Sequence, residues 1–172
     1  MTTSLYDATV ATFLQTLGGV EGFLGRGFEH CRGTGMDSKD IIDARLYPDM
    51  LPFRFQIASV IAHSLGAIEG VRKGVFNPPT TPELDYVGLQ KAVTEARDTL
   101  KKISPEEVNG FAGKDMRFEF RERTIPFVAE NFLLSFSIPN FFFHSSIAYG
   151  ILRSKGIPLG KRDFMGQLRI KR

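Results

Sequence analysis

The stretch FVAENFLLSFSIPNFFFHSSIAYGILRSKG, residues 127–156, decides the fold, because it predicts a long helical block late in a chain of 172 residues. The end of the block is marked by Gly156, which follows Lys155 and precedes Pro158, a combination typical of a helix C-terminus. Pro139 lies inside the block, and an internal proline kinks a helix or splits it in two. We therefore expect a last helix that is kinked or divided near Pro139.

Three more long helices are predicted before this block. Residues 4–30 carry apolar side chains at helical spacing behind Ser4, a residue suited to capping. Residues 51–74 form a second amphipathic pattern, and residues 81–103 form a third that opens on a Thr-Pro-Glu sequence. Shorter helical turns are predicted at residues 38–50 and 104–107.

The segment DMRFEFRERTIPF, residues 115–127, differs from the rest of the chain. Phe118 and Phe120 alternate with Arg117 and Glu119, and this period of two is typical of a strand or one arm of a hairpin. No alternation of strands and helices accompanies it. The pattern predicts a single all-α domain over residues 1–172, an up-and-down four-helix bundle with a short extended excursion before the last helix.

Composition narrows the setting of the protein. Hydrophobic residues make up 42% of the chain, with 16 phenylalanines and no tryptophan, so the core is expected to be rich in phenylalanine. Cys31 is the single cysteine, which favours a reducing compartment, and no signal peptide or membrane span is recognisable. We expect a cytoplasmic protein. Basic residues gather in residues 153–172, but no nucleic-acid-binding motif accompanies them, so no nucleic-acid or membrane partner is expected.

Two of the three histidines lie on predicted long helices among apolar residues. His144 shares a helix face with Asn140 and Ala148, and His63 lies on the second long helix. Two histidines on inward-facing helices can meet in a bundle core. Each could be a hydrogen-bonded core residue, an acid/base or substrate-contacting group, or a metal ligand. Two histidines alone rarely hold a metal, and Ala148 stands where a second ligand on the same helix would be needed.

Further candidate site residues surround the histidines in the sequence. The adjacent residues Phe141, Phe142 and Phe143 cannot all face one way on a helix, so part of this cluster either lines a cavity or meets another chain. In the segment before the second helix, Asp49 either caps that helix or, with Arg45 and Tyr47, forms the rim of a pocket.

Two blocks of the sequence together resemble a known family. ARLYPDMLPFRFQ (44–56) and IPNFFFHSSIAYGILRSKGIPLGKRDFMG (138–166) are similar to an uncharacterised domain-of-unknown-function family within the DinB/YfiT-like superfamily. The resemblance implies an up-and-down four-helix bundle, often a dimer. The wider superfamily includes metal-dependent thiol transferases and isomerases with three histidine ligands. His144 matches the first histidine of a pair on the last helix, Ala148 replaces the second, and His63 falls roughly where the third would lie. The resemblance therefore implies a departure from the metal site, and we expect no cofactor.

Three hypotheses follow. The leading one is a small-molecule enzyme of isomerase, cyclase or lyase type, using metal-free acid/base chemistry on an apolar or aromatic substrate in a phenylalanine-lined cavity. The alternatives are a divergent metal-dependent thiol transferase or isomerase and a non-catalytic, dimeric small-molecule-binding protein; a homodimer is expected in any case. In the leading hypothesis the catalytic residues are His144, His63 and Tyr149, and the substrate-binding residues are Asn140, Phe141, Arg45, Tyr47, Asp49 and Gln56.

Overall fold

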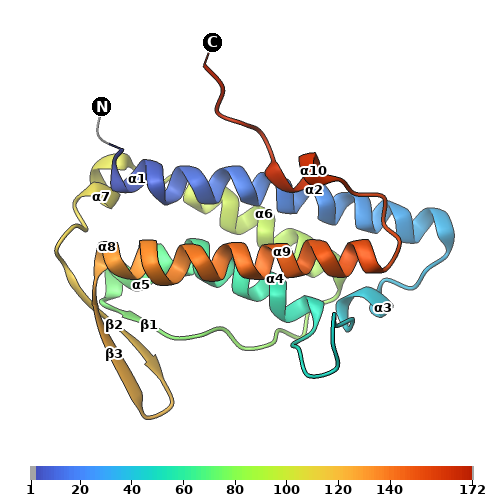
Figure 1. Ribbon diagram of the computed structural model, residues 1–172, viewed down its shortest axis with the longest axis horizontal. Coiled ribbons are helices and arrows are strands. Elements are labelled where there is room, and N and C mark those ends of the chain that lie inside the picture. The colour runs from blue at the N-terminus through green and yellow to red at the C-terminus, as the bar shows by residue number, and fades with distance from the viewer. Residues whose placement is uncertain (1–2, 172) are drawn as a thin grey trace.

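The computed structural model describes residues 3–171 and is mostly helical, with one small sheet (Figure 1). The expectation of an all-α chain is therefore wrong in its strict form. Among residues 3–171 no helix combines the length and the apolar character needed to cross a bilayer. The elements are α1 (Leu5–Ala8), α2 (Val10–Thr34), α3 (Lys39–Ile42), α4 (Phe53–Ile61), η1 (Ala62–Gly66), α5 (Ala67–Lys73), β1 (Val75–Phe76), α6 (Tyr86–Leu100), α7 (Pro105–Asn109), β2 (Asp115–Phe120), β3 (Arg123–Val128), α8 (Ala129–Asn131), η2 (Phe132–Ser137), α9 (Ile138–Ser154) and α10 (Lys161–Met165).

The helix starts follow their capping residues. Ser4 accepts a hydrogen bond from the backbone of Asp7, as its position predicts, but the first helix breaks at Thr9 before α2 continues to Thr34. The third long helix does not begin at residue 81. It begins at Tyr86, because the side chain of Asp85 accepts a hydrogen bond from Gly88 N at 2.7 Å and the preceding proline-rich segment lacks the amide donors of a helix.

The last helical block passes Pro139 without dividing. Segments α8, η2 and α9 are contiguous from Ala129 to Ser154, and the residues directly before Ile138 form a π-helix. Proline removes one backbone donor and clashes with the carbonyl four residues earlier. The wider π turn gives that carbonyl another geometry, so the chain continues as one helical segment. Of the two outcomes expected at Pro139, a kink or a division, the division is therefore excluded.

The small sheet closes one end of the helical body. The β2–β3 hairpin is antiparallel and pairs Phe120 with Arg123, which confirms the extended segment predicted at residues 115–127. β1 adds in parallel, with Phe76 opposite Phe118. Because β1 has only two residues, it offers no alternation for a sequence pattern to reveal. The hairpin projects from the end of the molecule (Figure 1), and Phe76 attaches the sheet to the core, 4% exposed.

The long helical segments pack in a defined way. α4 packs chiefly against α9, and α2 packs chiefly against α6. Phe141 on α9 meets Phe13 on α2 edge to face, with ring centroids 4.9 Å apart, so the phenylalanine-rich core joins both sides. The segment around α10 lies on α2: a Cβ at Gly19 would come within 2.3 Å of the carbonyl oxygen of Phe164.

Candidate histidine site

His63 and His144 lie next to each other in the structure. Their ring centroids are 6.0 Å apart and their ring planes differ by 9°. His63 belongs to the π-helical segment η1 that continues α4, and His144 lies in the middle of α9. Because α4 and α9 are the most closely packed helices, side chains from their facing sides meet. The structure therefore brings together two histidines whose meeting the sequence left open.

Gln56 determines which nitrogen of His144 carries the proton. Its amide Nε2 donates to the carbonyl of Leu51 at 2.8 Å, so its oxygen Oε1 faces His144 Nδ1, also at 2.8 Å. An amide oxygen only accepts hydrogen bonds, so Nδ1 must be the donor. In a neutral imidazole the lone pair then lies on Nε2. The Gln56 contact therefore fixes the tautomer of the neutral His144 ring, in which Nε2 is the basic nitrogen.

His63 has a polar partner of its own. A hydrogen bond joins its Nδ1 to Ser137 Oγ at 3.5 Å, and both residues are buried. Gln56, Ser59 and His63 recur at spacings of three and four on one side of the helical segment. Ser59 Oγ is buried without a hydrogen-bond partner among residues 3–171. The facing helices thus carry a short polar stripe inside an apolar core.

Two of these residues lie in π-helical turns. His63 is in η1 and Ser137 is in η2, the segment that precedes Pro139. Single π turns inside α-helices are frequent at functional sites, because the extra residue rotates the side chains that follow. Sequence reasoning did not single out Ser137 or Ser59. The available signal was their helical spacing: Ser137 precedes His144 by seven residues and Ser59 precedes His63 by four, which places each serine on the same side of its helix as the histidine.

Burial keeps both imidazoles neutral near pH 7. Desolvation lowers the pKa of His144 to about 4. Desolvation also lowers the pKa of His63 to about 4, and repulsion from a charged His144 contributes in the same direction. The second effect means that the two rings resist carrying positive charge together. The pair can therefore hold at most one proton easily, and only for a short time at neutral pH.

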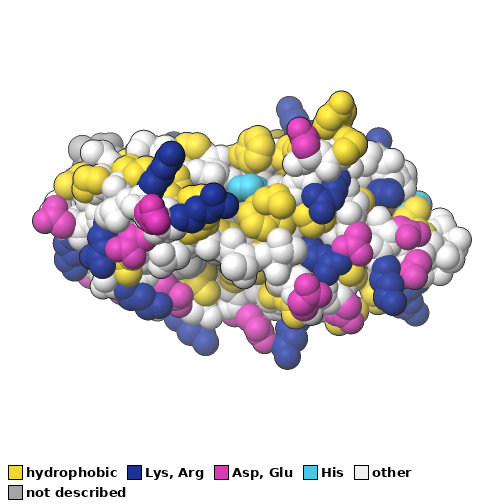
Figure 2. Space-filling view, turned by 90° about the horizontal axis from the view of Figure 1, so that it is seen from below, with side chains coloured by type: hydrophobic (Ala, Val, Ile, Leu, Met, Phe, Trp, Pro, Cys, Tyr) yellow, Lys and Arg dark blue, Asp and Glu magenta, His cyan; other side chains and the backbone are white. Residues whose placement is uncertain are grey.

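Aromatic side chains surround the pair. Phe76 and Phe136 lie 5.2 Å and 5.6 Å from His63, measured between ring centroids. Phe55 and Phe143 lie 5.9 Å and 5.2 Å from His144, and Phe143 is 57% exposed. His144 itself is half-buried. Figure 2 shows one face of the molecule on which a histidine reaches the surface among hydrophobic side chains.

Three other predicted residues of the last helix point elsewhere. The Tyr149 hydroxyl donates to the carbonyl of Leu159 at 3.4 Å, and its ring packs against Phe23, so the structure does not bring it to the histidines. Phe141 is fully buried against α2. The amide of Asn140 donates to the carbonyl of Phe136 within its own helix at 2.8 Å. Helical rotation separates Tyr149 from His144, whereas Asn140 and Phe141 lie three to four residues from His144 and are engaged by other partners.

The predicted rim residues lie in the loop before α4. Arg45, Tyr47 and Asp49 are all exposed, and the guanidinium of Arg45 donates to the carbonyl of Met50. Asp49 does not cap α4, whose N-cap position is Pro52. The loop reaches the histidine site through Leu51, whose carbonyl accepts the hydrogen bond from Gln56. Of the predicted substrate-binding residues within the described part of the chain, only Gln56 forms a hydrogen bond with a histidine of the pair.

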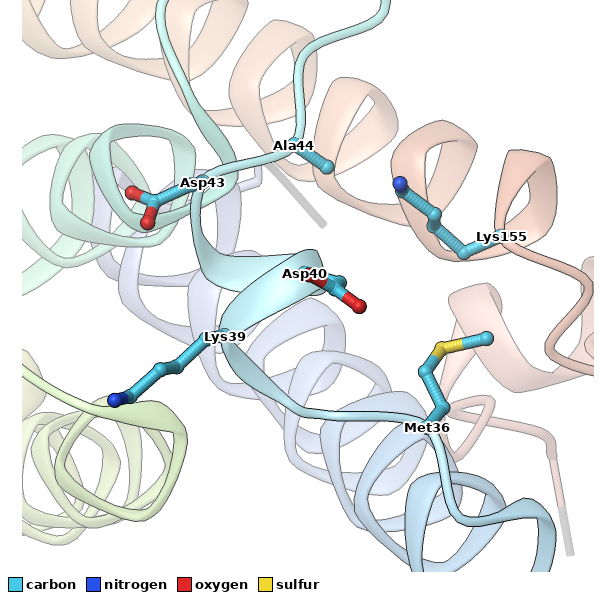
Figure 3. A pocket seen from close by; sticks show the side chains of 6 residues that line it. All are labelled: Met36, Lys39, Asp40, Asp43, Ala44 and Lys155. Atoms are coloured by element: carbon cyan, nitrogen blue, oxygen red, sulfur yellow. The ribbon is translucent and has the colours of Figure 1, made fainter.

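Within residues 3–171 the structure has three surface pockets that neither His63 nor His144 lines. One lies between α3 and the end of α9, where Asp40 and Lys155 reach toward the hollow while Lys39 points away (Figure 3). A second lies under the C-terminal segment, and a third lies at the hairpin turn. A preformed phenylalanine-lined cavity beside His144, as expected from the sequence, is not one of these three.

The residues present do not fit the three-histidine metal site that the superfamily implies. The position of the second histidine on the last helix is occupied by Ala148, whose methyl group is fully buried and has no donor atom. Within residues 3–171 no group of three His, Cys, Asp or Glu side chains is placed to hold a metal ion. The Nδ1 atom of His144 is also committed to Gln56.

Comparison with known proteins identifies relatives of the fold. The model of a domain of unknown function, DUF1993, matches residues 5–165. The crystal structure of a DinB family member protein from Shewanella denitrificans superposes with a TM-score of 0.77 and 21% sequence identity, covering 98% of this chain and 95% of that one. No curated protein matches this chain. An identity this low supports a shared fold alone.

Proposed function

Since this chain belongs to the DUF1993 family, a domain of unknown function with a DinB-like fold, we propose its function from the geometry of its own histidine pair. We infer that the protein moves a proton on a small apolar or aromatic molecule, as an isomerase, cyclase or lyase does. His144 Nε2 is the proton acceptor. The observation that carries the proposal is the Gln56–His144 hydrogen bond, which leaves Nε2 with a lone pair in a partly desolvated aromatic setting.

The proposed step conserves atoms and charge. A C–H or O–H bond of the substrate breaks, its electron pair stays on the substrate, and the proton passes to His144 Nε2. The resulting imidazolium is a strong acid, because the pKa of His144 is about 4. It returns the proton to another atom of the same molecule or, in an elimination, to the departing group, whose bond to the substrate breaks with the electron pair staying on that group. His63 stays neutral during this step and stabilises the polar face of the bound molecule. This cycle requires no external oxidant, reductant or nucleophile.

A chemical probe can test the base before a natural substrate is known. The probe 5-nitrobenzisoxazole is apolar and aromatic. A base removes its C3 proton while the ring N–O bond breaks, which yields 2-cyano-4-nitrophenolate. We expect the parent protein to convert the probe about tenfold or more faster than His144→Gln. The gain should be smaller than that from a base with a pKa near 7, because a group with a pKa of about 4 is weakly basic. His30→Gln, which changes a histidine on α2 outside the pair, is the matched control and should keep the full rate.

The pH profile makes the test specific. The rate should rise with a midpoint near pH 4 and stay constant above pH 6, whereas an ordinary histidine would give a midpoint near 6.5. Gln56→Leu should lower the rate, because the tautomer of His144 is no longer fixed. Equal rates for the parent protein and His144→Gln would refute the proposal.

A second candidate function has support from the surface around His144. Phe143 is 57% exposed beside the histidine, and the three pockets lie elsewhere. In this candidate the protein is a homodimeric small-molecule-binding protein of the cytoplasm, built on an up-and-down four-helix bundle, and the aromatic face is the subunit contact. Light scattering after size exclusion tests it: a dimer that Phe143→Asp converts to a monomer supports this candidate, and a monomeric parent protein contradicts it.

A further inference from the structure

A larger pocket lies away from the histidine site, under the C-terminal segment. It has a volume of about 900 Å³, within the range of small-molecule sites. Its walls come from α1, α2, the end of α6 and residues 167–170. Figure 1 shows the C-terminal segment leaving α10 and rising above α2. Because residues 167–170 of this segment line the pocket together with the helices, we call the pocket the wedge.

The turn of the chain at the base of the wedge is held in place. Gly166 adopts φ +63°, and a Cβ there would come within 2.3 Å of the carbonyl oxygen of Gln15, so only glycine fits. The side chain of Gln15 donates to the carbonyl of Met165 at 3.1 Å, and Arg26 pairs with Asp163 at 3.1 Å. These contacts hold α10 against α2 and set the direction in which residues 167–170 leave the surface. The position of the pocket wall is therefore built into the fold.

The polar part of the pocket is positively charged. Arg97 and Arg169 line it, and its lining, as far as residues 3–171 form it, contains no carboxylate. Arg97 gives one nitrogen, Nη1, to Glu21 at 2.6 Å. Its Nε is buried and has no hydrogen-bond partner within the described chain. With Glu21 counted, two positive charges face one negative charge, and the balance suits a ligand with a single negative charge.

The other part of the pocket is apolar. Ala11 and Leu14 form its floor on α2, and Leu168 and Ile170 form its upper wall. These two wall residues are 49% and 74% exposed, an unfavourable position for large aliphatic side chains in water. Arg169 lies between them in the chain and lines the same pocket, so this short segment supplies both apolar groups and a cation. A ligand with an apolar chain would bury both wall residues when it enters.

We propose that this pocket binds an amphipathic monocarboxylate, with its carboxylate between Arg97 and Arg169 and its alkyl chain between Leu14 and Leu168. Arginine is suited to this task because its planar N–H groups match the two oxygens of a carboxylate. The proposal is independent of the histidine chemistry, since no residue of the pocket belongs to that site.

The test uses decanoate as the probe and isothermal titration calorimetry on the full chain. We expect one decanoate to bind per chain, and we expect decanol, which has the same chain without the charge, to bind at least about tenfold more weakly. Arg169→Ala should weaken decanoate binding several-fold and Arg97→Gln about tenfold or more. Lys171→Ala removes the same charge from the same exposed segment but does not line the pocket, so it serves as the matched control and should bind like the parent protein.

Each outcome decides the proposal. Decanoate binding that is weakened by Arg169→Ala and unchanged in Lys171→Ala and His144→Gln supports it. Absence of binding, binding unaffected by both arginine substitutions, or equal affinity for decanol would overturn it. Inorganic phosphate binding as tightly as decanoate would also overturn it, because the apolar wall would then have no role. Arg169 is exposed, so its replacement tests the site even if Arg97→Gln fails to fold.

Discussion

Lowering the pH from 7 to about 4 should destabilise the protein through His63. In the unfolded chain this histidine binds a proton below pH 6.5, whereas in the folded protein its pKa is about 4. Between these two values the unfolded state holds the extra proton, so the free energy of unfolding falls as the pH decreases. The contribution of the neutral His63 to the free energy of unfolding is fully present above pH 6.5 and is lost as the pH falls to about 4. The difference between 6.5 and about 4 corresponds to about 3 kcal/mol.

The assay is urea denaturation followed by far-ultraviolet circular dichroism at several pH values from 7 to 4.5. Carboxylates also titrate in this range, so the informative quantity is the pH dependence lost on substitution. The His63→Gln variant has no imidazole at this position to take up the proton. Between pH 7 and pH 4.5 its free energy of unfolding should therefore decrease by about 2 to 3 kcal/mol less than the free energy of unfolding of the parent protein does. His30→Gln is the control and should keep the parent's dependence. Equal pH dependence in the parent protein and His63→Gln would refute the reasoning, because it would mean that His63 is not desolvated.

Two other substitutions test separate contacts. Gln56→Glu places a carboxylate beside His144 Nδ1 and should raise the pKa of His144 by about 1 to 3 pH units, measured by a histidine NMR titration; an unchanged pKa would contradict the contact. Gly19→Ala should lower the free energy of unfolding by about 1 to 3 kcal/mol, because its Cβ would meet the carbonyl oxygen of Phe164. Gly22→Ala on the same helix meets open space and should be neutral or stabilising by up to about 1 kcal/mol, so equal losses in both variants would argue against the docked tail.

The arrangement of the candidate site was only partly predictable. Two histidines on two long amphipathic helices made a meeting of His63 with His144 possible, because such faces turn inward, but the register of the two helices was needed to decide it. Tyr149 and Phe141 were grouped with them on proximity in the sequence, yet Tyr149 faces Phe23 and Phe141 faces Phe13. A helix turns by about 100° per residue, which places Tyr149, five residues after His144, on another side of the helix. Phe141 lies near the face of His144, but its ring packs against α2, and only the tertiary packing decides that contact.

The π-helical turns were another feature beyond the reach of the sequence pattern. Pro139 indicated a disturbance in the last helix, but not whether the chain would kink, divide or widen. The packing of that segment against the facing helix settles the choice, because a contiguous buried helix retains more contacts than a divided one. The same widening sets the position of Ser137, which is why the partner of His63 was missed.

The sequence by itself determined the long helices, the hairpin arm, the caps at Ser4 and Ser104, and the absence of a second histidine at Ala148, because these depend on local pattern and residue identity. Tertiary structure alone decided the tautomer of His144, the low pKa values of both histidines, and the charged wedge under the C-terminal segment. Those properties arise from desolvation and from contacts between residues far apart in the chain, such as Gln56 with His144 and Gln15 with Met165. Local periodicity carries no information about such contacts, since they exist only once the helices have packed.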